Sequence, residues 1–222
     1  MTQTLELQYF FDPLCGWCYA SAPALEGLAN TFPAQLRMMP SGLFFGSRPV
    51  SSMADHAWRN DQRIQSLTGQ QFSEDYHQNV LLNPNGVFTS APATLALQIL
   101  GEIDAKLEPA FLHAVQIARY VDGHETSGEE EAAKVAVAVA AEHGVDLTIK
   151  DVIDRLRNDA ALRERSLERM EASQARMSEL GIRGVPQLVT VIDGKPTDLN
   201  GEILYHVPER LLAAIRDLTI TA

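Results

Sequence analysis

Apolar and polar positions near the start of the chain follow the pattern of a strand, a helix and a second strand. Residues 5–11 form a short apolar run that predicts a strand. Residues 20–30 carry apolar side chains at helical spacing and predict a helix, and residues 35–40 predict a second strand, parallel to the first. Ligand chemistry in open α/β sheets lies at the carboxyl ends of the strands, so the segment after the first strand is a candidate site.

The pattern is helical from about residue 51 to residue 180, with no convincing strand. Ser73 precedes two acidic residues, and Thr148 lies three residues before Asp151, as in a capping box, so both mark helix starts. The last helical segment is charged on one face and apolar on another, which fits packing within the chain or against a second copy. The predicted helices are residues 52–67, 73–81, 91–103, 109–120, 128–143, 149–158 and 160–180.

The pattern returns to strands after Gly181. A loop leads through Pro186 into a β-branched strand, and Asp193-Gly194 predicts a two-residue hairpin turn. Residues 197–200 are predicted to return as the paired strand, and an amphipathic helix is predicted before the end of the chain. The order of elements is β-α-β, a large helical block and α-β-β-α, which predicts an α/β protein.

Composition and charge narrow the class of protein. The 222 residues are enough for one domain with a sizeable core, or for a small domain with a large insertion. The formal net charge of -11 argues against nucleic acid or an anionic membrane as a partner, because both require a basic surface. The first six residues lack the basic and apolar regions of a signal peptide, and no apolar run is long enough to span a bilayer. We therefore expect a cytoplasmic protein.

Cys15 and Cys18 are the only cysteines in the chain, and they follow the first predicted strand. At a strand-to-helix junction the first thiol lies at the helix N-terminus, where unpaired N–H groups and the helix dipole favour a thiolate. The second thiol lies one turn on, on the same face and within disulfide reach. In a reducing compartment a lone Cys-X-X-Cys is more often catalytic than structural.

Two other interpretations of the cysteine pair fit the sequence less well. A disulfide with a purely structural role would close a loop too short to add much stability. A structural zinc ion usually needs four ligands, and we predict no metal because the histidines are scattered, with no pair at short spacing: His56, His77, His113, His124, His143 and His206.

Two short motifs resemble those of the thioredoxin fold: Cys-Gly-Trp-Cys at residues 15–18 and Gly-Ile-Arg-Gly-Val-Pro at residues 181–186. The large helical segment between them resembles the DsbA family, and the Asp-Pro-X-Cys-X-Trp-Cys pattern resembles its FrnE-like cytosolic branch. The resemblance implies a thioredoxin fold with a central mixed sheet, made from residues 1–48 and 166–222. It also implies an all-helical insertion domain at residues 49–165.

The resemblance further implies roles for individual residues. Cys15 would be the nucleophile that forms a mixed disulfide, Cys18 the resolving thiol, and Val185–Pro186 a cis peptide bond facing them. No metal or organic cofactor is implied, and glutathione or another thiol carrier is a candidate co-substrate. The residues expected to shape the site and contact the substrate are Asp12, Pro13, Gly16, Trp17, Val185 and Pro186.

The chain departs from the family pattern at two places. Many thioredoxins carry a buried acid six residues before the nucleophile, where this chain has Tyr9. Asp12 is the nearest acid, and we expect it to cap the turn before the helix. Gly16 and Trp17 replace the Pro-His pair of the strongly oxidising enzyme, in which a protonated histidine stabilises the thiolate. We therefore predict a less depressed pKa for Cys15, and a weaker oxidant than DsbA, whose potential is about -120 mV.

The predicted function is thiol–disulfide exchange between the Cys15–Cys18 pair and protein dithiols, protein disulfides or glutathione. A reducing cytosol favours reductase or isomerase activity. Two alternatives remain open. A glutathione-dependent isomerase or transferase of the kappa type resembles the same insertion topology but needs only one nucleophile, at the position of Cys15. A non-catalytic peptide-binding or chaperone module would use the apolar surface of Trp17, Phe44 and Phe45. The sequence fits a monomer or a homodimer.

Overall fold

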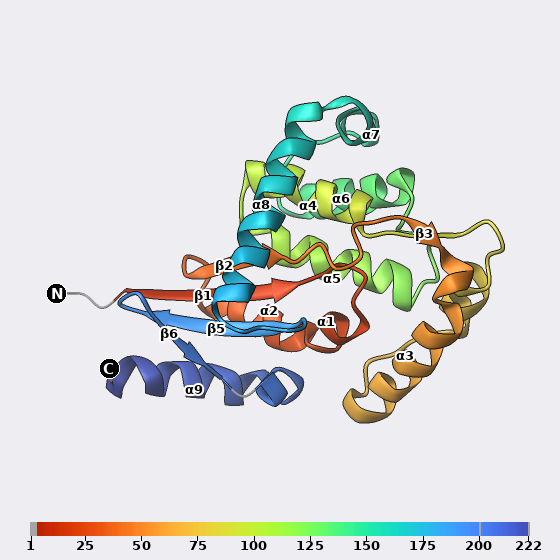
Figure 1. The fold of residues 1–222 in the computed structure, drawn as a ribbon. Helices are drawn as coiled ribbons and strands as arrows, with labels where there is room; N and C mark the ends of the chain where they lie inside the picture. Colours follow the sequence, from red (N-terminus) through yellow and green to blue (C-terminus); the bar gives the residue numbers. More distant parts are fainter. Residues whose placement is uncertain (1–3, 200, 222) are drawn as a thin grey trace.

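A four-stranded mixed sheet forms the centre of one half of the molecule (Figure 1). The computed structural model describes residues 4–199 and 201–221. The strand order is β2-β1-β5-β6, and β1 runs parallel to β2 and antiparallel to β5. The four strands are β1 (Leu5–Phe11), β2 (Leu36–Pro40), β5 (Gln187–Ile192) and β6 (Lys195–Asp198). The sheet and the helices around it have the thioredoxin fold that the two motifs predicted.

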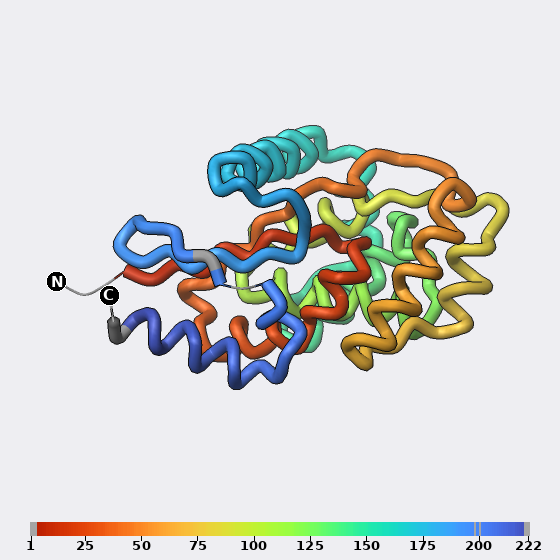
Figure 2. The backbone as a smooth tube through the Cα atoms, turned by 60° about the horizontal axis from the view of Figure 1, so that its bottom comes forward, coloured from red at the N-terminus to blue at the C-terminus, as the bar shows by residue number. Residues whose placement is uncertain are grey.

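Helices cover both faces of this sheet (Figure 2). α8 crosses one face and contacts β2, whereas α2 and α9 pack together on the other face. β1 alternates between the two sides, since Gln8 accepts a hydrogen bond from Arg176 of α8 while Leu7 and Tyr9 are fully buried. The bounds of these helices are α2 (Ala22–Thr31), α8 (Ala160–Glu179) and α9 (Pro208–Thr221).

A block of helices is inserted between β2 and β5. α4, α5, α6 and α7 pack against one another, and α8 joins the block to the sheet. Thr148 caps α7 as the sequence predicted, because its hydroxyl oxygen accepts a hydrogen bond from the N–H of Asp151 at 3.1 Å. The bounds are α3 (Ala54–Thr68), the π-helix η2 (Tyr76–Leu81), α4 (Ala91–Ile103), α5 (Leu107–Tyr120), α6 (Glu129–Glu142) and α7 (Ile149–Asn158).

The structure adds two strands that the sequence did not predict, and it moves the start of one predicted strand. The block is not free of strands, because β3 (Arg48–Pro49) pairs with β4 (Val87–Phe88), and strands of two residues leave no detectable pattern. The strand after the hairpin begins at Lys195 rather than residue 197, because Asp193 and Gly194 take φ values of 47° and 79° and form the whole turn. The predicted end of that strand, Asn200, lies outside the described residues.

The helix predicted at residues 20–30 corresponds to α2, and a separate short helix, α1 (Gly16–Ala20), precedes it with a break at Ser21. Pro23 lies in the first turn of α2, where its missing N–H costs no helical hydrogen bond. α1 begins directly after Cys15, so the break leaves the cysteine pair on a short helix of its own. No helix in the described part of the chain is long and apolar enough to cross a membrane.

Candidate active site

The two cysteines lie on the first turn of α1, just beyond the end of β1. Cys15 is the N-cap residue of this helix, and its carbonyl oxygen accepts hydrogen bonds from the N–H groups of Cys18 and Tyr19 at 2.9 and 3.1 Å. Both cysteines are free thiols, and their side chains are hydrogen-bonded to each other. Cys15 is 7% exposed and Cys18 is fully buried, so a reagent in solvent reaches only Cys15.

The buried position of Cys18 makes the two thiols chemically different. Burial raises the pKa of the Cys18 thiol well above its ordinary value, and the hydrogen bond with Cys15 raises it further. The main chain of Asp12 hydrogen-bonds to the same sulfur and opposes these effects only in part. Cys18 therefore remains protonated at neutral pH until a reaction lowers the cost of removing its proton.

The loop that precedes β5 lies directly opposite Cys15. The Cys15 thiol donates a hydrogen bond to the carbonyl oxygen of Val185 at 3.5 Å, and the Val185–Pro186 peptide bond is cis. The antiparallel pairing of β1 with β5 brings these segments together, although the whole helical block separates them in sequence. Pro186 is buried and Val185 is half-buried beside the cysteine.

Asp12 connects the turn before Cys15 to two other segments. One carboxylate oxygen accepts a hydrogen bond from the N–H of Leu14 at 3.0 Å, which is the predicted cap of the turn. The other accepts from the N–H of Phe44 at 2.9 Å and from the hydroxyl of Ser90 at 3.1 Å. Burial raises the pKa of Asp12, and these three hydrogen bonds oppose that rise. Asp12 is fully buried, and its hydrogen bonds link the turn before Cys15 to Phe44 and Ser90.

The remaining predicted residues surround the cysteine turn. Pro13 is buried directly before it. Trp17 is half-buried, and its ring centroid lies 5.1 Å from that of Tyr205. Gly16 faces Asp61 of α3 so closely that a Cβ atom at Gly16 would lie 2.5 Å from a carboxylate oxygen. The fold brings every predicted site residue to this turn, and their roles in the reaction remain predictions.

Three contacts at the site were not anticipated from the sequence. Tyr9 occupies the position of the usual buried acid, and burial raises the pKa of its hydroxyl so that it stays uncharged. That hydroxyl lies 2.7 Å from the hydroxyl of Ser21, which in turn donates to the carbonyl oxygen of Cys18 at 3.0 Å. The contacts of Tyr205 with Trp17 and of Asp61 with Gly16 join distant segments, and no local pattern marks them.

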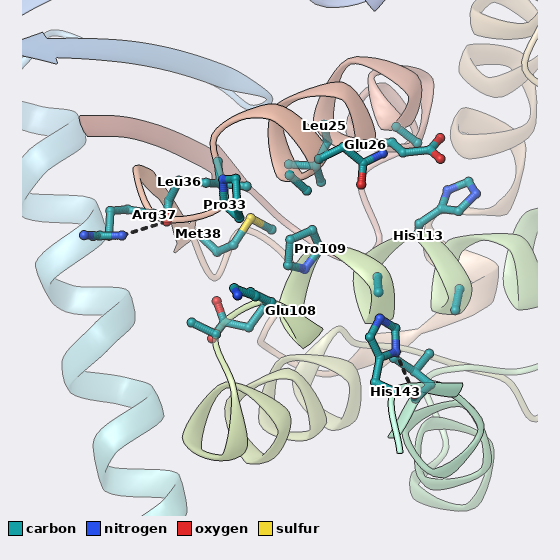
Figure 3. A pocket seen from close by; sticks show the side chains of 18 of the residues that line it. Leu25, Glu26, Pro33, Leu36, Arg37, Met38, Glu108, Pro109, His113 and His143 are labelled. Carbon is teal, nitrogen blue, oxygen red and sulfur yellow. Dashed lines mark hydrogen bonds between the residues drawn. The ribbon is translucent and has the colours of Figure 1, made fainter. Parts of the chain in front are cut away.

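A separate cavity of about 920 Å³ lies between α2, β2, α5 and α6 (Figure 3). Leu25, Met38 and Pro109 supply part of its apolar lining, and neither cysteine contributes to it. Arg169 binds both carboxylate oxygens of Glu108 at its edge, so those charges are already paired. Among the described residues, no three His, Cys, Asp or Glu side chains come close enough to hold a metal ion.

Solved structures resemble the chain over nearly its full length. The cytosolic disulfide reductase DsbM from Pseudomonas aeruginosa is 28% identical, with a TM-score of 0.82 over 97% of this chain and 100% of that chain. The structure of that reductase with GSH is 28% identical, with a TM-score of 0.78 over 96% and 98%. A candidate protein disulfide isomerase from Nitrosomonas europaea shares the fold, at 21% identity and a TM-score of 0.74 over 99% and 100%. No protein-family profile and no curated sequence matches.

The similarity includes the helical block as well as the sheet, because the alignments cover almost the whole of both chains. The chain also carries the paired thiols that a disulfide reductase needs, at the end of β1. Fold, full-length similarity and the dithiol together indicate a thiol–disulfide oxidoreductase that is similar to DsbA-family proteins of the thioredoxin fold.

Proposed function

We propose that this oxidoreductase works in the cytoplasm as a glutathione-linked disulfide reductase, with Cys15 as nucleophile and Cys18 as resolving thiol. The observation that carries this assignment is the asymmetry of the two thiols. Cys15 retains 7% exposure at the end of β1, whereas Cys18 is fully buried and its pKa is raised by burial. Cys15, the more accessible of the two thiols, meets the substrate first, and Cys18 reacts only after Cys15 has formed a mixed disulfide.

The proposed reaction transfers two electrons from the enzyme dithiol to the substrate disulfide. Cys15 loses its proton to solvent, and its thiolate attacks one substrate sulfur, so that the substrate S–S bond breaks and one substrate thiol leaves with a proton. The Cys18 thiol then gives up its proton and attacks the Cys15 sulfur. The second substrate thiol leaves, and the enzyme holds a Cys15–Cys18 disulfide. Two glutathione molecules reduce this disulfide in two exchange steps and leave as glutathione disulfide.

The geometry around Cys15 supports attack on an extended peptide or thiol. The Val185 carbonyl oxygen faces the Cys15 sulfur at 3.5 Å and offers an acceptor for a substrate N–H group. Trp17, packed against Tyr205, supplies an apolar surface next to the same thiol. Glutathione and a cytosolic location are supported by the resemblance to DsbM, which is described as cytosolic and was solved with GSH.

The test is glutathione-dependent reduction of a peptide that contains one disulfide, with formation of glutathione disulfide as the measured product. The unmodified protein is expected to accelerate the reaction above the rate of glutathione alone. The Cys15→Ser variant is expected to give only that background rate, because serine cannot form the mixed disulfide. Turnover by Cys15→Ser equal to that of the unmodified protein would show that the Cys15 thiol is not the nucleophile.

A further inference from the structure

One acidic side chain of the helical block packs directly against the cysteine turn. Asp61 lies on α3 and is only 4% exposed, and α3 contacts α1 along several residues. One carboxylate oxygen lies 2.5 Å from the position of a Cβ atom at Gly16, the residue that follows Cys15. The side chain of Ile64, one turn further along α3, lies 3.1 Å from the same position. A glycine at residue 16 is therefore what allows this carboxyl group to approach the turn.

Asp61 is held in place from the side away from Gly16. The Tyr76 hydroxyl of η2 donates a hydrogen bond to the second carboxylate oxygen at 3.0 Å, and Asn60 contributes another. Two residues of α5 also face the carboxyl group, the cationic Arg119 and the buried phenol of Tyr120. The cluster is buried and its geometry is fixed by packing from three elements.

The positive charge of Arg119, which faces Asp61, is already balanced by another carboxylate. Arg119 is 1% exposed, and it forms an ion pair with Glu125 at 3.0 Å. Burial raises the pKa of Asp61 to about 7, and the hydrogen bond from Tyr76 and the charge of Arg119 only partly oppose this rise. Both the neutral and the charged form of Asp61 are therefore populated near neutral pH. The carboxyl group packs on Gly16, the residue that follows the nucleophile Cys15.

We propose that Asp61 is a positioning residue for the exchange reaction: its carboxyl group holds the cysteine turn through Gly16, and its negative charge opposes formation of the Cys15 thiolate. The proposal rests on the proposed function, since it assumes that Cys15 attacks as a thiolate. Two like charges on neighbouring groups in a poorly solvated site repel each other more strongly than they do in water. When Asp61 is neutral that repulsion is absent, and Cys15 loses its proton to solvent more easily.

The test is titration of the Cys15 thiolate by ultraviolet absorbance, in a Cys18→Ser background so that a single thiol contributes. The Asp61→Asn variant keeps the size of the side chain and an acceptor for Tyr76 but carries no charge. It is expected to raise the acid dissociation constant of Cys15 about threefold or more. Asp55→Asn removes one charge from the exposed first turn of the same helix and is the matched control, for which no shift is expected.

A second variant keeps the carboxyl group and changes only its tendency to ionise. Tyr76→Phe removes the hydrogen bond to Asp61, so the carboxyl group stays neutral to higher pH and the Cys15 thiolate forms more easily than in the parent. The shift is expected in the same direction as for Asp61→Asn, and smaller. A loss of packing alone gives no reason for the two variants to agree in sign.

The proposal is overturned if Asp61→Asn and the parent titrate at the same pH, or if Asp55→Asn shifts the titration equally. That result would leave the proposed function intact as long as Cys15→Ser lacks glutathione-dependent turnover. Full turnover by Cys15→Ser would instead remove the proposed function, whatever the titration shows. Should Asp61→Asn not fold, an unchanged titration in Tyr76→Phe is by itself sufficient to reject the proposal.

Discussion

The sheet half of the molecule and the helical block contribute to the site in different ways. The sheet half provides the reacting atoms and a main-chain group, namely the thiols of Cys15 and Cys18 and the carbonyl oxygen of Val185. The block provides side chains that surround them, with Ser90 bound to Asp12 and Asp61 packed on Gly16. The comparison indicates that strand pairing assembles the exchange chemistry, whereas the insertion adjusts the environment in which it occurs.

Loss of the second thiol of the sheet half is expected to have the largest effect. In Cys18→Ser the mixed disulfide on Cys15 has no internal thiol to resolve it, so reduction of a peptide disulfide falls toward the background rate. The trapped adduct on Cys15 is measured by mass spectrometry of the intact protein. Full turnover by this variant would instead favour a glutathione-dependent transferase or isomerase that uses Cys15 alone.

The next largest expected effect is a change in the free energy of unfolding with pH, caused by Asp61 in the helical block. Asp61 has a pKa of about 7 in the folded chain and an ordinary value of 3.8. Its neutral form therefore favours the folded state, and this contribution to the free energy of unfolding is fully present below about pH 4 and is lost as the pH rises through 7. The unmodified protein is therefore expected to lose up to about 4 kcal/mol relative to Asp61→Asn across that window. Urea unfolding of both proteins between about pH 4 and pH 8 measures the difference. A difference in unfolding free energy between the two proteins that stays constant across this pH range would contradict a raised pKa for Asp61.

The contact between the two regions is tested by adding a single methyl group. Gly16→Ala places a Cβ atom 2.5 Å from a carboxylate oxygen of Asp61, and overpacking of this kind costs about 1–3 kcal/mol. Combining it with Asp61→Ala is expected to relieve the clash, so the two losses of unfolding free energy are not additive. Gly46→Ala is the matched control, because a Cβ atom there would meet nothing within 4 Å. Equal losses at Gly16 and Gly46 would argue against a tight contact.

The smallest expected effect lies in the block, away from the thiols. Thr148→Ala removes the N-cap of α7 and is expected to cost about 1 kcal/mol of unfolding free energy. Because α7 packs mainly against α4, α6 and α8, turnover at a temperature where the variant is folded should equal that of the unmodified protein. A clear fall in turnover would show that the block influences the site through more than its local contacts.

Local patterns were enough to predict much of the fold. The apolar run of β1, the capping box at Thr148 and the Asp-Gly turn at Asp193 each depend on neighbouring residues, and each was found where the sequence indicated. The cysteine pair was recognisable for the same reason. The two-residue strands β3 and β4 were missed because they are too short to show alternation.

The surroundings of the thiols could not be predicted in the same way. Asp61 lies between Asn60 and Gln62 and appears in the sequence as one polar residue among others on an amphipathic helix. Its burial depends on how α3 packs against α1, which is a property of the assembled fold. The contact of Tyr205 with Trp17 likewise joins the two ends of the chain and has no local signal.

The most direct test of the dithiol site is equilibration of the protein with graded glutathione redox buffers, followed by alkylation and mass measurement of the free cysteines. The predicted result is a reversible two-electron transition between a Cys15–Cys18 dithiol and disulfide, at a potential more negative than the value of about -120 mV for DsbA. Cysteines that remain alkylatable in every buffer, or a transition near the DsbA value, would contradict the proposed function as a cytoplasmic reductase.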